Sequence, residues 1–214
     1  MMETEVLCVD PSNPDPNVIR RAGEIICSGE LVAFPTETVY GVGGDAFDPD
    51  AAAKLFEAKG RPANNPLPVL IADIDDIVRL ADKVPLVAWK LVEAFFPGPL
   101  TLVLRASERV PKIVTAGTGN IGIRMPDHPV ALAIIKEAGR PLATSSANVS
   151  GQPAPMNADE AFAYLNGKIK LLIDGGPTLI GIASTVLDLS GESPSVLRSG
   201  AISEEMLQPY LEEL

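Results

Sequence analysis

The chain has 214 residues, of which 46% are hydrophobic and 21% charged, and its formal net charge is -11. This composition excludes a disordered chain and predicts a soluble globular protein with a sizeable core. The negative net charge argues against nonspecific nucleic-acid binding through a strongly positive surface, and it leaves a local basic groove open.

Strands and helices are predicted to alternate along the chain, from runs of apolar residues and from the capping residues, prolines and glycines that bound them. In chain order we predict a strand at 5–9, a helix at 17–28, a strand at 31–34, helices at 49–58 and 74–81 around a strand at 67–71, a helix at 85–96, strands at 100–105 and 121–126, a helix at 129–138, a strand at 141–144, a helix at 157–165, strands at 171–174, 184–189 and 195–198, and a closing helix at 203–211. Residues 110–119 are predicted to be irregular. We find no internal repeat, linker or shift in composition, so the pattern predicts one α/β domain over residues 1–214.

The two cysteines, Cys8 and Cys27, have no metal-ligand spacing, and we interpret them as small core residues in a reducing compartment. A disulfide between them is the alternative. The amino terminus lacks a basic region followed by an apolar one, and no apolar run approaches the roughly 18 residues that cross a bilayer. We therefore expect a cytoplasmic protein without a membrane segment.

Several common catalytic signatures are absent. The sequence has no Gly-x4-Gly-Lys-Ser/Thr phosphate loop, and its glycine run at 41–44 lacks the dinucleotide fingerprint. It also lacks a His-Glu-x-x-His motif or a Cys/His cluster, so we expect no protein-bound metal. We interpret His128, the only histidine, as an exposed turn residue without a nucleophile partner, and Trp89 as a core residue.

Polar residues gather where the predicted strands end. They form four loops, at 36–40, 59–65, 144–148 and 184–185, and Arg124 and Arg198 end two further strands. Because ligands of an open α/β sheet bind at strand ends, we expect these residues to share a crevice. Lysine and arginine there suit a phosphate chain or a carboxylate, which indicates phosphoryl or nucleotidyl transfer.

Each of these residues also has a purely structural interpretation. Lys59 and Gly60 fit an ordinary helix C-terminus, and the serines and threonines fit turns that bond their own backbone. Arg124 and Arg198 fit surface ion pairs, which are frequent and weak. Thr36 and Thr38 cannot be separated at this stage, and Thr36 fits a structural role.

The segments PTETVYG, KGR, SSAN, STV and VLRSGAI together resemble the YrdC-like family of threonylcarbamoyl-adenylate synthases. The resemblance covers roughly Val18 to Ile202, and the paired Lys-x-Arg and Ser-x-Asn motifs match at Lys59, Arg61, Ser146 and Asn148. It implies a twisted, mixed, open α/β sheet flanked by helices around a central cationic cavity, in the short form that lacks an added C-terminal domain.

The resemblance also implies an activity, the conversion of L-threonine, bicarbonate and ATP to threonylcarbamoyl-adenylate and pyrophosphate. A downstream transferase then modifies tRNA, and direct binding of tRNA or double-stranded RNA is left open. Some relatives have histidine at the position of Leu70, which puts a polar contact to threonine from there in doubt. The implied roles are threonine binding by Thr38, Arg124, Thr144 and Ser184; ATP binding by Arg61, Asn65, Ser146, Asn148 and Arg198; catalysis by Lys59 and Arg61; and Mg2+ on the phosphates.

The chemistry fits these residue types. A carbamate oxygen attacks the α-phosphorus of ATP, and both reactants are anions, so the protein must mainly bring them together and screen their charge. Two rival functions remain: an RNA-binding protein without turnover, and a paralogue that acts on another amino acid.

We predict that alanine at Lys59 or Arg61 abolishes pyrophosphate release and leaves the fold intact, because each removes a cation from the phosphates. A pyrophosphate assay paired with circular dichroism checks both parts. Wild-type rates in either variant would remove that residue from the proposed site.

Overall fold

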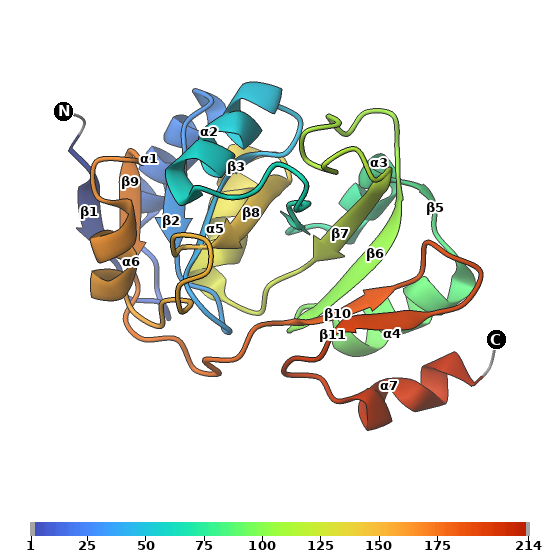
Figure 1. The fold of residues 1–214 in the computed structure, drawn as a ribbon. Coiled ribbons are helices and arrows are strands. Elements are labelled where there is room, and N and C mark those ends of the chain that lie inside the picture. Colours follow the sequence, from blue (N-terminus) through green and yellow to red (C-terminus); the bar gives the residue numbers. More distant parts are fainter. Residues whose placement is uncertain (1–2, 213–214) are drawn as a thin grey trace.

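The computed structural model describes residues 3–212, in which all strands join one twisted, mixed sheet (Figure 1). The sheet has 11 strands in the order β1-β9-β2-β3-β8-β4-β7-β6-β10-β11, and β5 also pairs with β6. The strands are β1 (Glu5–Cys8), β2 (Val32–Phe34), β3 (Gly41–Asp45), β4 (Val69–Leu70), β5 (Ala81–Lys83), β6 (Leu100–Ala106), β7 (Asn120–Arg124), β8 (Leu142–Ser146), β9 (Leu171–Asp174), β10 (Thr185–Asp188) and β11 (Ser195–Arg198). The helices are α1 (Pro16–Cys27), α2 (Pro49–Lys59), a 3-10 turn (Ile74–Asp76), α3 (Ile77–Leu80), α4 (Leu86–Phe95), α5 (Pro129–Ala138), α6 (Ala158–Leu165) and α7 (Glu204–Leu211).

The core lies on both faces of the sheet, because successive strand residues point to opposite sides. In β9, Leu171 and Ile173 pack into one cluster with α1 and α5, whereas Leu172 packs into the other with α2, α4 and α6. The same alternation occurs in β8, where Leu142 and Ala143 belong to different clusters. Helices therefore flank the sheet on both sides, which confirms the expected fold class. One domain over residues 1–214 stays a prediction.

The predicted elements are mostly present, and the exceptions have local causes. The strand expected at 67–71 pairs only at Val69–Leu70, and the helix expected at 74–81 is a 3-10 turn, a short α3 and the unpredicted strand β5. The glycine-rich strand β3 also escaped prediction, because glycine has a low strand propensity. Asp48 caps α2 as expected, and Gly60 ends it with the left-handed φ of 57° that glycine permits.

Two predictions about single residues are wrong. Cys8 and Cys27 are free and exposed, not core residues, since they lie at the ends of β1 and α1 with their side chains on the surface. His128 is not an exposed turn residue: it is only 9% exposed at the N-cap of α5, and it lies close enough to Glu37 for the charge of that carboxylate to act on its pKa. Trp89 is half-buried and packs against the core, as expected.

Within residues 3–212, no helix combines the length and the apolar composition that crossing a bilayer requires.

Glycine in β3 is required by close approach of the neighbouring strand. Gly43 pairs with Thr144 of β8, and a Cβ at Gly43 would lie 2.6 Å from the carbonyl oxygen of Ala143. At Gly41, by contrast, the nearest atom would be at 3.7 Å, an ordinary contact. The glycines thus let β3 lie flat against the strand that carries Thr144, Ser145 and Ser146.

We predict that Gly43→Ala lowers the free energy of unfolding by about 1–3 kcal/mol, because β8 must shift to admit the methyl group. Gly41→Ala is the matched control in the same strand and should cost clearly less. Urea denaturation of both variants measures the difference, and equal losses would show that close packing at Gly43 is not the cause.

Candidate active site

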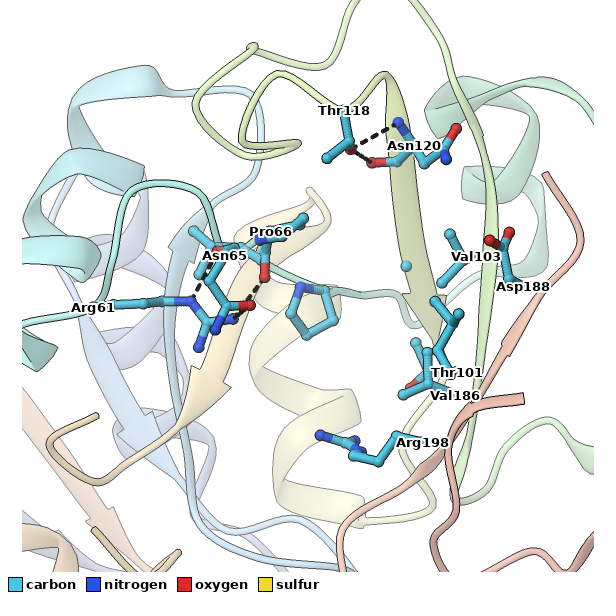
Figure 2. A pocket seen from close by; sticks show the side chains of 14 residues that line it. Arg61, Asn65, Pro66, Thr101, Val103, Thr118, Asn120, Val186, Asp188 and Arg198 are labelled. Carbon is cyan, nitrogen blue, oxygen red and sulfur yellow. Dashed lines mark hydrogen bonds between the residues drawn. The ribbon is translucent and has the colours of Figure 1, made fainter. Parts of the chain in front are cut away.

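A cavity opens beside the sheet and has two adjoining halves, which share Arg61, Pro68, Thr101 and Arg198 in their walls. The first, which we call the apolar half, has a volume of about 310 Å³ and is walled by side chains such as Leu67, Val103, Val186 and Leu197. Figure 2 labels Val103 and Val186 in this wall. The second, which we call the polar half, has a volume of about 180 Å³. Its walls carry mainly hydroxyls and guanidinium groups: Thr36, Thr38, Arg61, Thr101, Arg124, Thr144, Ser145, Ser146, Ser184 and Arg198.

Arg61 stands where the two halves meet, and the loop that follows it determines its direction. Its Nε donates to the carbonyl oxygen of Asn65 at 3.0 Å, and its Nη2 donates to Asn65 Oδ1 at 2.8 Å and to the Pro66 carbonyl at 2.7 Å. Nη1 reaches Ser145 Oγ at 3.3 Å. Asn65 therefore lines the apolar half and also orients Arg61.

Lys59 and Asn148 lie behind the wall of the cavity. Lys59 is 1% exposed, and its Nζ donates to the carbonyl oxygens of Ser146 and Asn148. The Asn148 amide donates to the carbonyls of Val149 and Gln152, so it shapes its own loop. The Lys-x-Arg motif thus binds the Ser-x-Asn motif through Lys59. Of the four motif residues, only Arg61 and Ser146 line the cavity.

The burial of Lys59 changes what its alanine variant tests. The substitution removes the donor to two buried carbonyls and leaves a void, so it should also disturb the loop at Ser146. Burial, and then the charge of Arg61, lowers the pKa of Lys59 to about 8. Arg61, which lines the cavity, is the cleaner test of charge screening.

Arg198 and Ser184 form a second fixed group, on β11 and just before β10. The Nε and Nη2 of Arg198 donate to the Ser184 carbonyl at 3.1 and 2.8 Å, and Nη2 also reaches Ser184 Oγ at 3.1 Å. Ser184 Oγ in turn lies 2.8 Å from Thr101 Oγ1. Figure 2 shows Arg198 and Arg61 entering the cavity from opposite sides.

Arg124 lies at the end of β7, in the polar half. Its Nε donates to the Gly98 carbonyl at 3.1 Å and its Nη2 to Thr38 Oγ1 at 2.9 Å. The hydroxyl of Thr36 instead donates to the Val39 carbonyl at 2.6 Å. Thr36 therefore closes the turn, whereas Thr38 contacts Arg124. The two hydroxyls also lie 2.9 Å apart, and both threonines line the polar half.

The guanidinium groups repel one another across the cavity. Burial, followed by the charge of Arg198, lowers the pKa of Arg61; burial, followed by the charge of Arg124, lowers the pKa of Arg198. Within residues 3–212, neither Arg61 nor Arg198 forms an ion pair. A bound polyanion would relieve this repulsion, so the cavity is arranged to hold negative charge.

The structure brings most of the predicted residues together. Those that line the cavity are Thr38, Arg61, Asn65, Arg124, Thr144, Ser146, Ser184 and Arg198, while Lys59 and Asn148 support its wall. Leu70 lines the polar half as an apolar residue, so its side chain offers no polar contact there. Thr144 uses its hydroxyl to bond the Pro68 carbonyl at 3.2 Å.

Two residues at the site escaped the sequence analysis. Thr101 lines both halves, and its signal was a single hydroxyl within the apolar strand β6. Glu37 lies 2.7 Å from Arg124 and is 5% exposed. Its signal was its place between two threonines in the turn, but a glutamate in a turn gives no sign that it will be buried.

Among the described residues, no group of three or more histidine, cysteine, aspartate or glutamate side chains gathers where it could hold a metal ion.

Comparisons with known proteins agree with this geometry. Residues 24–200 match the Sua5/YciO/YrdC family model, which is described as telomere recombination. The solved structure of Pyrococcus abyssi Sua5 complexed with L-threonine superposes with a TM-score of 0.95 at 44% identity, covering 99% of this chain and 62% of that one.

Two curated relatives carry related names. The threonylcarbamoyl-AMP synthase of Pyrococcus abyssi is 47% identical over 92% of this chain, which spans 58% of that relative's length. The putative threonylcarbamoyl-AMP synthase of Mycobacterium tuberculosis is 39% identical over 95% of this chain and 93% of its own length. From the family match and these identities, the chain belongs to the Sua5/YciO/YrdC family.

Proposed function

We propose that the protein is an L-threonylcarbamoyladenylate synthase, which converts L-threonine, bicarbonate and ATP to threonylcarbamoyl-AMP and pyrophosphate. The observation that carries the proposal is the two-part cavity with arginines at its junction. The names of the relatives and the threonine in the Pyrococcus abyssi structure support the choice of substrates.

Each half of the cavity suits one substrate. The apolar half suits a nucleoside, because base faces pack well on apolar walls, and the triphosphate would extend toward Arg61 and Arg198. The polar half suits a small amino acid, whose carboxylate would bind Arg124 beside the hydroxyls of Thr38 and Ser184. In this assignment Thr144 and Ser146 line the amino-acid side, and Asn65 the nucleotide side.

The proposed reaction forms one phosphorus–oxygen bond and breaks another. The threonine amine first forms a carbon–nitrogen bond with bicarbonate, which loses water, or with carbon dioxide, in which case the amine loses a proton, and either route gives a carbamate. A carbamate oxygen then attacks the α-phosphorus, and the bond from that phosphorus to the bridging oxygen breaks, so that pyrophosphate leaves with the bond's electrons. Arg61 and Arg198 would screen the charge on the phosphates, and Arg124 would hold the amino acid in line.

Mg2+ enters the proposal only as a companion of the ATP phosphates. Asp188 is the one carboxylate among the described residues that line either half, and its Oδ1 already accepts from the amide and hydroxyl of Ser190. The lining therefore offers no cage of carboxylates for a protein-held Mg2+, and we assign the ion no ligand residue. The proposal also includes a cytoplasmic location and a downstream transferase that passes the threonylcarbamoyl group to tRNA.

The test is pyrophosphate release by the purified protein with ATP, bicarbonate and L-threonine. We predict release that requires all three substrates, and a loss of at least about 100-fold in Arg61→Ala, because that substitution removes transition-state charge screening. Arg79→Ala is the matched control, since Arg79 is paired with Asp76 away from the cavity.

The other outcomes decide between the rivals. Release that does not depend on threonine would favour a paralogue acting on another amino acid. No release, with tight and steeply salt-dependent binding of RNA, would favour an RNA-binding protein.

A further inference from the structure

The buried carboxylate of Glu37 is paired with Arg124, one of the arginines that line the polar half. Glu37 is 5% exposed, and its Oε1 lies 2.7 Å from Nη2 of Arg124, a residue that is 7% exposed. Both carboxylate oxygens are buried and lack a hydrogen bond within residues 3–212. Burying a carboxylate is costly unless it is paired, so this position demands an explanation.

The backbone around Glu37 is held in place by another segment of the chain. The amide of Ile180 donates to the Glu37 carbonyl at 3.0 Å, and the amide of Gly181 donates to the Thr38 carbonyl at 2.9 Å. The Thr36 hydroxyl closes the turn from the inside. The turn is therefore pinned, and it directs the Glu37 side chain toward Arg124.

Arg124 is the cation that balances Glu37. The nearby His128 does not serve this role, because burial lowers its pKa further than the charges of Glu37 and Asp127 raise it. The imidazole is thus neutral near pH 7. Among the described residues, Arg124 is also the only group that forms an ion pair with Glu37.

The contacts of Arg124 leave one edge of its guanidinium group free. Gly98 binds Nε, and Thr38 and Glu37 both lie against Nη2, whereas Nη1 makes no hydrogen bond within residues 3–212. Three fixed contacts on one side of a planar group determine where its other edge points. That edge is the part of Arg124 available to a ligand in the polar half.

We infer that Glu37 is a positioning residue for the reaction, which holds the Arg124 guanidinium so that its free edge meets the carboxylate of the amino-acid substrate. Glu37 itself does not line the cavity, so it acts through Arg124 rather than on the substrate. The inference rests on the proposed function, since it assumes that an amino acid binds beside Arg124.

The test is the steady-state kinetics of Glu37→Gln, which keeps the shape of the side chain and removes its charge. We expect the KM for L-threonine to rise at least about tenfold, while the KM for ATP changes less than about threefold, because only Arg124 is misplaced. Glu37→Asp keeps the charge and should recover part of the loss.

A matched control separates a general loss of stability from a specific effect on threonine binding. Asp45 is another buried carboxylate, paired with Arg140 at 2.5 Å, and it does not line either half of the cavity. Asp45→Asn should lower the melting temperature, as Glu37→Gln does, but leave the threonine KM unchanged. A double variant adds a second criterion: Glu37→Gln should have no further effect on the threonine KM in an Arg124→Gln background.

An unchanged threonine KM in a folded Glu37→Gln protein would overturn the inference, and so would equal rises for both substrates or additive effects in the double variant. If Glu37→Gln does not fold, Glu37→Asp carries the same comparison of the two KM values. Failure of the proposed function looks different, because the wild-type protein would then show no threonine-dependent turnover.

Discussion

The site depends on how the guanidinium groups around the cavity are held in place without being neutralised. Arg61 is bound by the carbonyls of Asn65 and Pro66, Arg198 by the carbonyl of Ser184, and Arg124 by that of Gly98. A carbonyl dipole fixes the direction of a cation but cancels little of its charge. The cavity is thus preorganised for anions before any substrate enters, and the reorganisation cost is met by folding. Glu37, against Arg124, is the exception.

The sheet and the buried lysine make this arrangement possible. The strands β8, β4 and β7 lie side by side, and β8 runs antiparallel to the other two, so Ser146 and Arg124 lie at opposite ends of these strands. Both residues line the polar half, which therefore extends along the strands between them. Lys59, the last residue of α2, donates to the carbonyls of Ser146 and Asn148, and this ties the helix that precedes Arg61 to the strand that carries Ser146. Stability and function therefore share the same contacts here.

Local patterns in the sequence predicted most helices and the strand-end positions of the candidate residues, because caps, apolar runs and turn residues report local structure. They did not predict β3, since this glycine-rich segment is a strand through its pairing with β2 on one side and β8 on the other. Nor did they separate Arg61, which lines the cavity, from Lys59, which supports it, or reveal the burial of Glu37 and His128. Those properties come from contacts between distant segments, which no local pattern encodes.

Proton uptake on ATP binding is the most direct measure of the uncompensated positive charge around the cavity. Burial lowers the pKa of Lys59 to about 8, and an anion beside Arg61 should raise that pKa. Calorimetric titrations from pH 7 to pH 10, in buffers of different ionisation enthalpy, should therefore show proton uptake on ATP binding that passes through a maximum with pH and is lost in Lys59→Met. Binding without proton uptake by the wild-type protein would contradict the account.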